Sequence, residues 1–418
     1  MILIGGLAGC RPAPPPEPEL PEVTLKPVDP TNPPLTPVHC AIATDSPTLL
    51  PIMVASELGY FADAGIEVTV TQLDDNSLDA QTQLLNALKR DDIDCIAQTV
   101  DAYLRAKAGQ VAFETSIVAS VYTSTGADAL VVTSDITSLN DLLDQSIGGD
   151  RHHPAIIMTY YALRELGYSP GDIRVQPIDL EKWEKVLEEG AEQTEQIKEA
   201  EQAGETEQAG ETEQAEQTEA AIQNPLEETD SNIGELLEEE QEKGPELADI
   251  FTAENVVAIA LSEPLLSAVM AETEATDHYP LLTSTDFNEL ITEVLIVETE
   301  TLGKTDEFQW GDKSRQYRGL LQGLYRAIAL SQTDPQTFLA VGTDGERSPQ
   351  DMAQALAGIT YTTYPVAQEI MGTPEKSGRL FQIFADLNTV HLELGLQQQL
   401  LFYDDHVNAH LIQDLPVP

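Results

Sequence analysis

Two histidines near the end of the chain have a spacing that suits metal chelation. His406 and His410, in the sequence HVNAH, stand four residues apart, so on a helix both imidazoles would face one side and could bind the same ion. His391 lies upstream, but the sequence offers no obvious further ligand. We therefore expect no metal site and no cofactor, and we interpret these histidines as solvent-exposed or capping residues.

The charge balance excludes several classes of function. The 418 residues include 72 Asp and Glu against 21 Lys and Arg, which gives a formal net charge of -51. Nucleic acids and anionic lipids are bound through clustered Lys and Arg, so neither is an expected partner. The H-E-x-x-H pair of zinc peptidases and the G-x-x-x-x-G-K-[ST] phosphate loop are missing from the sequence. We expect a binding protein and not an enzyme.

Polar side chains gather where the expected strands end. In an open parallel sheet, ligands bind beyond the carboxyl ends of the strands, where helix N-termini present unpaired N–H groups. The candidate ligand-binding residues at these ends, with two near the expected hinge between the lobes, are Ser46, Thr48, Asn76, Ser77, Asp101, Tyr122, Thr123, Arg151, His152 and Glu263. Ser46, Thr48, Ser77 and Asp101 could also serve simply as helix caps.

Two of these candidates favour ligands of opposite charge. Arg151 could hold an oxyanion with two hydrogen bonds, or it could form a surface ion pair with nearby carboxylates. Glu263 and Asp150 instead favour a ligand that donates hydrogen bonds or carries positive charge, such as an aminopyrimidine. The residues alone leave this choice open.

Strand-like and helix-like segments alternate from residue 38 onward, and this alternation positions the candidates. Between residues 38 and 124, strand-like runs such as VHCAIAT and IEVTVTQL are separated by helix-like runs such as SLDAQTQLLNALKR. This β-α-β succession predicts a parallel sheet wrapped by helices. The pattern restarts near residue 125. We therefore expect an α/β protein with two lobes, each a parallel or mixed sheet wrapped by helices.

The rest of the chain completes this organisation. Lobe 1 begins with residues 38–124, and residues 125–288 form lobe 2. An acidic low-complexity insert at 190–246, in which EQAGET occurs twice in succession, interrupts lobe 2. We interpret it as an expanded surface loop, with a partner-binding tail as the alternative. Residues 289–418 return the chain to lobe 1 and end in helices, so two crossings between the lobes would form a hinge.

The chain opens with an apolar run, MILIGGLAGC, that leads into a proline-rich segment. Its last four residues, Leu7 to Cys10, look like the lipobox of a bacterial lipoprotein. This resemblance implies that residues 1–10 are a truncated signal and that Cys10 carries a lipid. For residues 11–37 we expect an extended tether that forms neither helix nor strand.

Cys40 and Cys95 lie inside two of the strand-like runs. Apolar residues surround both, so packing is their expected role. An exported protein could oxidise them to a disulfide, but neighbouring strands of a parallel sheet rarely offer the geometry that a disulfide needs.

The order of these segments resembles the substrate-binding proteins of ABC importers in the sulfonate, nitrate and thiamine-precursor group, the NMT1/THI5-like proteins. That family has a helix followed by G-[YF]-F-x-x-x-G-[IL]-x-V, matched here by Gly59, Tyr60, Phe61, Gly65, Ile66 and Val68. Its element before the third strand is matched by Asp92-Ile93-Asp94, and its I-x-S-x-x-D-L element by Ile136, Ser138, Asp141 and Leu142. The similarity covers roughly residues 38–183 and, more loosely, 250–345.

The resemblance implies a type II periplasmic-binding-protein clamp that closes two lobes around a small molecule outside the cytoplasm. Such a monomer would deliver its ligand to the transmembrane subunits of an ABC permease and touch the membrane only through a lipid at Cys10. The expected ligand is a sulfonate, a nitrate-like ion or another small organic anion. The alternatives are an aminopyrimidine of the thiamine-precursor type, or a membrane-anchored sensory or scaffold module with the same fold. The nearest enzymes would be thiamine-precursor synthases, and a lipid anchor argues against that role.

Overall fold

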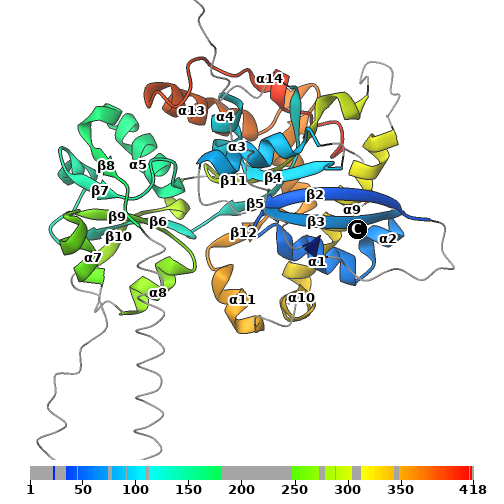
Figure 1. Ribbon diagram of the computed structural model, residues 1–418, viewed down its shortest axis with the longest axis horizontal. Helices are drawn as coiled ribbons and strands as arrows, with labels where there is room; N and C mark the ends of the chain where they lie inside the picture. The colour runs from blue at the N-terminus through cyan, green and yellow to red at the C-terminus, as the bar shows by residue number, and fades with distance from the viewer. Residues whose placement is uncertain are drawn as a thin grey trace, which may run out of the picture.

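The computed structural model of the protein describes residues 22–23, 34–44, 46–73, 78–90, 92–108, 113–179, 247–272, 278–287, 289–303, 312–342, 348–413 and 415–416. Two sheets lie side by side in it, each flanked by helices (Figure 1). The predicted lipidation residue Cys10 and the insert at 190–246 lie outside the described residues. Within the described ranges, no helix is long and apolar enough to cross a membrane.

The larger sheet has the strand order β1-β3-β2-β4-β11-β5-β12. The strands are Glu22–Val23 (β1), Thr36–Ala43 (β2), Ile66–Leu73 (β3), Cys95–Thr99 (β4), Thr115–Ser124 (β5), Thr292–Glu298 (β11) and Ile359–Tyr361 (β12). β2 pairs in parallel with β3 and β4, as the β-α-β pattern predicts, whereas β11 is antiparallel to β4 and β5. Every residue of β5 is buried, because helices cover both faces of the sheet.

Two groups of helices cover the larger sheet (Figure 1). One group consists of α1 (Leu49–Glu57), α2 (Tyr60–Asp63), α9 (Asp312–Thr333) and α10 (Pro335–Gly342), and the other of α3 (Leu78–Ala87), α4 (Val100–Ala108) and α13 (Leu380–Glu393). Helix α9 approaches α2 so closely that a Cβ on Gly323 would lie 2.3 Å from the Phe61 ring. The absence of a side chain at Gly323 therefore permits this packing. Smaller helices follow in the last part of the chain: α11 (Pro349–Ala355), α12 (Tyr364–Met371) and α14 (Tyr403–His406).

The smaller sheet has the strand order β10-β6-β9-β7-β8. Its strands are Asp128–Thr133 (β6), Ser146–Gly148 (β7), Arg174–Gln176 (β8), Ala258–Ser262 (β9) and His278–Thr283 (β10). Side chains of β6 alternate between two apolar clusters, as the period of a strand requires. Leu130 and Val132 belong to the main cluster with residues of α5 (Pro154–Glu165). Ala129 and Val131 pack instead with residues of α7 (Leu247–Glu254) and α8 (Leu265–Glu272).

The chain passes between the sheets twice, from β5 to β6 and from β10 to β11. Ser284, in the short turn η4 (Ser284–Asp286), joins the two crossings, because its hydroxyl accepts a hydrogen bond from the Gly126 N–H at 2.7 Å and lies 2.6 Å from the Ser124 hydroxyl. Gly358, just before β12, packs on the first crossing. A Cβ on Gly358 would lie 2.2 Å from the nitrogen of Ala127, and its φ of 69° suits glycine.

Cys40 on β2 and Cys95 on β4 form a disulfide, with their Cα atoms 4.5 Å apart. The two residues are direct partners in the parallel ladder. The disulfide, which the sequence left open, is therefore present, and packing is not the only role of the two residues. Both are fully buried, so the apolar surroundings are as expected, but the sequence does not reveal the register that brings the sulfur atoms together.

Part of the proline-rich segment forms strands, so the expectation for residues 11–37 is wrong in two places. Glu22–Val23 pairs with β3 at the edge of the larger sheet, and β2 begins at Thr36. Proline has no N–H to donate, so within sheets it is confined to edges and strand starts. Pro37 satisfies this rule, because β2 pairs there with β3 alone and reaches β4 only further along.

Candidate functional site

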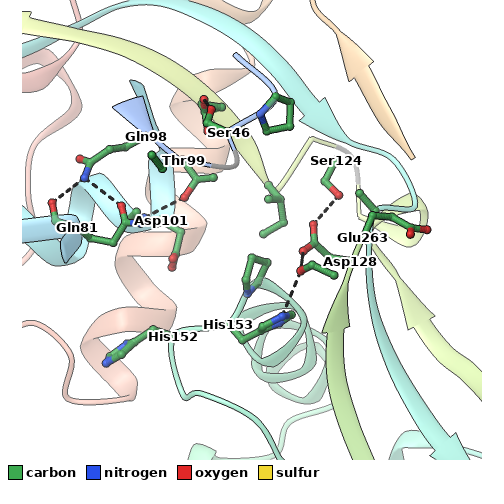
Figure 2. Close-up of a pocket in the computed structure, with 18 of the residues that line it drawn as sticks. Ser46, Gln81, Gln98, Thr99, Asp101, Ser124, Asp128, His152, His153 and Glu263 are labelled. Carbon is green, nitrogen blue, oxygen red and sulfur yellow. Dashed lines mark hydrogen bonds between the residues drawn. The ribbon is translucent and has the colours of Figure 1, made fainter. Parts of the chain in front are cut away.

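A cavity of about 690 Å³ lies between the two sheets. From the larger sheet, its wall includes Ser46 after β2, Thr99 at the end of β4 and the first turn of α4. From the smaller sheet, it includes His152 after β7 and Glu263 after β9 (Figure 2). The ends of β5 and β11 close the side next to the crossings. The cavity therefore lies at the carboxyl ends of strands from both sheets, where open α/β sheets bind ligands.

A buried carboxylate, Glu293 on β11, organises the wall beside the crossings. Its side chain is 5% exposed, and one oxygen accepts hydrogen bonds from the hydroxyls of Ser46 at 2.6 Å and Thr48 at 2.5 Å. The other oxygen accepts a hydrogen bond from the Tyr122 hydroxyl at 2.9 Å. Burial, together with the nearby Glu293 charge, raises the pKa of Tyr122 well above its usual range. Three residues expected to touch ligand thus fix this carboxylate.

Asp101, in the first turn of α4, forms a buried network at the opposite side of the cavity. Its Oδ2 lies 2.9 Å from Nη2 and 3.1 Å from Nε of Arg105, and its Oδ1 lies 2.5 Å from Nε2 of His391 on α13. Burial raises the pKa of the carboxyl, but Arg105 and His391 more than offset this and hold it at about 2. The carboxylate is also placed where it balances the positive end of the α4 dipole.

Asp128, at the start of β6, accepts two serine hydroxyls. Ser124 donates to Oδ2 at 2.6 Å and Ser262 donates to Oδ1 at 2.5 Å. The Nε2 of His153 lies 3.1 Å from the Ser262 hydroxyl, and its Nδ1 accepts the Ala155 N–H at 3.1 Å, which caps helix α5. The three side chains His153, Ser262 and Asp128 therefore form one series of hydrogen bonds. Figure 2 labels its two ends, His153 and Asp128.

These three hydrogen-bonded residues are of the types found in a hydrolytic triad. Their protons, however, are not placed as the triad mechanism requires. Because Nδ1 of His153 accepts a backbone N–H, the ring proton lies on Nε2 and is donated to Ser262. Ser262 gives its own proton to Asp128. In a triad the histidine accepts the proton of the serine, which His153 cannot do in this tautomer. Burial also lowers the pKa of His153, which keeps the ring neutral.

Gln98, on β4, lines the cavity and carries a buried acceptor. Its side chain is 2% exposed, and its Nε2 donates to the carbonyl oxygen of Gln81 at 2.7 Å and to the Gln81 side-chain oxygen at 3.0 Å. These bonds fix the orientation of the amide. Its Oε1 has no hydrogen-bond partner among the described residues. The amide is therefore fixed against Gln81, with its N–H groups used within the protein.

Glu263 lies on the rim of the smaller sheet. Its carboxylate accepts the Ser267 hydroxyl at 2.7 Å and the Ser267 N–H at 3.1 Å, in the first turn of α8. Burial raises the pKa of this carboxyl above its usual value. Glu263 thus caps a helix and is also one of the residues that line the cavity.

The structure brings together half of the predicted ligand-binding residues. Those that line the cavity are Ser46, Asp101, Tyr122, His152 and Glu263. Thr48 and Thr123 are buried but do not line it. Arg151 is exposed, is not among the lining residues and interacts with Tyr160. Asn76 and Ser77 lie outside the described residues.

Sequence reasoning missed several polar residues of the wall, namely Gln98, Ser124, Asp128 and Glu293. A usable signal existed for Glu293, which interrupts the apolar run LITEVLIVE. A charge in a buried strand requires hydrogen-bonding partners, so such a residue marks a polar site. Gln98 within CIAQT gives the same signal more weakly.

A second missed pattern is Gly167-Tyr168-Ser169-Pro170-Gly171, which matches the G-x-S-x-G of nucleophile elbows. An elbow requires a strand before the serine and a helix after it. Here the segment follows helix α5, Ser169 is exposed, and its N–H donates to Asp172 at 2.7 Å. Ser169 does not line the cavity. The match therefore has no catalytic context.

The histidine pair near the end of the chain does not share a helix. α14 ends at His406, and Val407 is extended. His406 is not solvent-exposed as expected. Its Nδ1 lies 2.7 Å from the Tyr103 hydroxyl, its ring stacks on Phe384, and burial lowers its pKa to about 4. Within the described ranges, no group of three or more His, Cys, Asp or Glu side chains could hold a metal ion.

Comparison with known proteins supports the expected resemblance. The family model described as NMT1/THI5 like matches residues 46–219, which confirms the resemblance over that region. No curated protein matches the chain by sequence.

Solved structures of similar shape include two sulfonate-binding proteins. The periplasmic aliphatic sulphonate binding protein SsuA from Escherichia coli is 13% identical, with a TM-score of 0.55, over 89% of this chain and 92% of that one. A putative periplasmic sulfonate-binding protein SsuA from Methylobacillus flagellatus KT is 10% identical, with a TM-score of 0.56, over 91% and 93% of the two chains.

The Candida albicans CA3427 gene product, whose structure shows the generic periplasmic binding protein fold, is 10% identical, with a TM-score of 0.51, over 90% and 96% of the two chains. At such identities the likeness concerns the fold. The predicted fold class is confirmed: the chain has the periplasmic-binding-protein fold, with mixed sheets wrapped by helices.

Proposed function

We propose that the protein binds a small solute in the cavity between its two sheets and delivers it to the permease of an ABC importer. The position of the cavity carries this proposal. It lies at the carboxyl ends of strands from both sheets and directly beside the two crossings. A rotation about the crossings would therefore open or close it around a ligand, the hinge motion of binding proteins. The likeness to periplasmic sulfonate-binding proteins supports the same role.

Two observations support a place outside the cytoplasm. The Cys40–Cys95 disulfide is of a kind that persists in oxidising compartments and is rare in the cytosol. The sequence around Cys10 supports a lipid anchor there. We therefore propose a monomeric lipoprotein that faces the permease from outside. Metabolic labelling with a fatty acid, compared between the wild type and Cys10→Ala, tests the anchor separately from ligand binding.

Thermal unfolding against a panel of solutes tests the binding function. The panel contains alkanesulfonates, taurine, nitrate, bicarbonate, aminopyrimidines and small amines. A ligand at a hundred times its Kd stabilises the bound form by roughly 2.7 kcal/mol, which is readily measured. Small-angle X-ray scattering with the same compound should show a smaller radius of gyration, because ligand favours the closed form.

Two tryptophan variants of helix α11 locate the binding. Ala355 lines the cavity, whereas Ala353 lies on the same helix and is exposed. We expect Ala355→Trp to lose the stabilisation by ligand because the larger ring enters the cavity, and Ala353→Trp to keep it. A ligand that stabilises both variants equally binds elsewhere. No stabilisation by any compound, with unchanged scattering, would contradict solute binding and favour a sensory or scaffold role.

A further inference from the structure

We infer that the solute is a small organic cation with N–H donors, such as an amidinium or ammonium compound, and not a sulfonate. This inference rests on the proposed binding function and concerns the same cavity. It follows from the charge of the wall, from the pairing of its arginine and from the direction in which its polar groups are hydrogen-bonded.

The described wall of the cavity is strongly acidic. Its carboxylates belong to Asp101, Asp128, Asp150, Asp179, Glu263 and Glu293. Among the described lining residues, Arg105 is the single Lys or Arg. An anion would meet an excess of negative charge from both sheets. A cation would be attracted by the same charges, and more strongly than in water, because Asp101, Asp128 and Glu293 are buried.

Arg105 is not positioned to balance this excess for an anionic ligand. Its Nη2 and Nε lie 2.9 and 3.1 Å from the same oxygen of Asp101. The side chains of the pair are 6% and 3% exposed. Because the carboxylate of Asp101 offsets the charge of Arg105, the pair adds no net positive charge to the wall that would attract a sulfonate.

The helix at this end of the cavity offers an anion little more. A helix N-terminus attracts negative charge through its dipole and its unpaired N–H groups. The first turn of α4 already contains the carboxylate of Asp101. The Thr99 hydroxyl accepts the Ala102 N–H at 3.2 Å, so one donor of this helix is also paired within the protein.

Three hydroxyls of the wall, those of Ser46, Tyr122 and Ser262, act as acceptors towards a ligand. A hydroxyl has one hydrogen and two lone pairs. Ser46 and Tyr122 donate their hydrogens to Glu293, and Ser262 donates its hydrogen to Asp128. These hydroxyls can therefore offer a bound molecule only their lone pairs, as acceptors of hydrogen bonds. Carboxylates and hydroxyls in this state recognise N–H groups and have nothing to donate to sulfonate oxygens.

Gln98 gives an independent indication of the same preference. Its Oε1 is buried at the wall and has no partner within the described part of the chain, while its Nε2 is held by Gln81. Leaving a buried acceptor unsatisfied costs about 1–3 kcal/mol. The amide of Gln98 also has no N–H to offer a sulfonate oxygen, because its Nε2 makes two hydrogen bonds to Gln81. The cavity is thus suited to a donor-rich cation.

Three compounds of nearly the same shape and different charge test the inference: benzamidinium, benzamide and benzoate. Isothermal titration of the full chain with each at low ionic strength gives the order of affinity. We expect benzamidinium to bind about tenfold or more tightly than benzamide, and benzoate to bind more weakly than either. The order benzoate, benzamide, benzamidinium would overturn the inference and leave solute binding in place. Equal affinities would overturn it too, because the cavity would then recognise shape without charge.

Charge-neutralising variants link the preference to the wall. Asp128→Asn keeps the shape of the side chain, and we expect it to weaken benzamidinium binding about tenfold while leaving benzamide within about twofold. Glu263→Gln, nearer the rim, should act in the same direction and provides a second variant should Asp128→Asn fold poorly. Asp135→Asn is the matched control, because Asp135 is exposed and does not line the cavity. An equal effect of Asp135→Asn would attribute the preference to overall charge and overturn the inference.

The solute panel covers the case in which none of the three compounds binds. The charge of the panel compound that binds then tests the inference. Binding of an anion overturns the inference but leaves solute binding in place. If no compound binds at all, the proposed function and the inference both fail. Failure of the inference alone is therefore distinguishable from failure of the proposed function.

Discussion

The imidazole of His391 lies 2.5 Å from the carboxylate of Asp101, although the two residues are 290 positions apart in the chain. His391 is fully buried and Asp101 is 3% exposed. This contact joins helix α13, near the end of the chain, to the first turn of α4 at the cavity wall. The late helices are therefore part of the structure that supports the cavity.

Acid should weaken the fold through Asp101. Its pKa is lowered to about 2 from the ordinary 3.8, so the charged form stabilises the folded state above pH 3.8, and this contribution is lost as the pH falls towards 2. The amount is about 2 kcal/mol. Urea unfolding at pH 4.5, 3.5 and 2.5 should show the loss, and Asp101→Asn should show less of it. An unchanged pH dependence in that variant would show that Asp101 is not the titrating group.

His406 should act in a separate, higher window of pH. Burial lowers its pKa to about 4 from the ordinary 6.5, so folding is favoured fully above pH 6.5, and this contribution decreases as the pH falls from 6.5 to 4. His406→Phe keeps a ring against Phe384 and cannot be protonated. We expect the variant to lack the part of the slope between pH 6.5 and 4 in urea unfolding. A slope identical to that of the wild type would contradict the assignment.

Tyr122→Phe should destabilise the fold by about 2 kcal/mol, because it removes a hydrogen bond to the buried carboxylate of Glu293. Tyr361→Phe is the matched comparison. The Tyr361 hydroxyl donates at 2.7 Å to a neutral acceptor, the carbonyl of Pro47, so its loss should cost about 1 kcal/mol. Urea unfolding of both variants at pH 7 measures the difference, and a larger effect of Tyr361→Phe would argue against a charged Glu293.

Removal of the disulfide should destabilise the larger sheet substantially. Cys40 and Cys95 are 55 residues apart, and closing a loop of that length stabilises a fold by about 4 kcal/mol in the chain-entropy description. The unfolding midpoints of the oxidised and the reduced wild-type protein measure this effect without any substitution. Mass spectrometry after thiol alkylation should confirm which form was measured. Equal midpoints for the two forms would contradict this expectation.

Gly358→Ala should be far more harmful than Gly395→Ala. Both glycines have a φ of 69°, so an alanine is strained at either position. A Cβ at Gly358 would also lie 2.2 Å from the backbone nitrogen of Ala127, whereas nothing lies within 4 Å of one at Gly395. We expect about 1 kcal/mol of destabilisation for Gly395→Ala and several times more, or failure to fold, for Gly358→Ala. Thermal unfolding of the two variants, or their soluble yield, tests this expected difference in stability.

The order of elements in the first lobe could be predicted because each helix or strand depends on the pattern of residues close together in the chain. The apolar run VHCAIAT and the sequence IEVTVTQL became the parallel pair β2 and β3, as expected. Strand partners in the smaller sheet could not be read in this way. β6 pairs antiparallel with β9, which lies more than a hundred residues later, beyond the insert. Such pairing depends on how distant apolar faces meet, which periodicity does not encode.

The position of the cavity could be predicted from the sequence, but the charge of its wall could not. Ser46 and Glu263 were located because the ends of strands could be estimated from the sequence, and such ends meet at one edge of a sheet. Ser46 and Tyr122 proved to be hydrogen-bonded to Glu293, a partner 247 and 171 positions away. The direction of those bonds leaves both hydroxyls as acceptors towards a ligand. That property arises only from the tertiary structure.

Ser284 has a mechanical consequence for any movement of the two sheets. Its hydroxyl lies within 2.7 Å of Gly126 and 2.6 Å of Ser124 on the first crossing, while its own backbone belongs to the second. Two strands tied side by side resist sliding and twisting against each other but still bend together. The lobes should therefore retain a single degree of freedom, rotation about one axis through Ser284, and their surfaces should meet again in the same alignment after each opening.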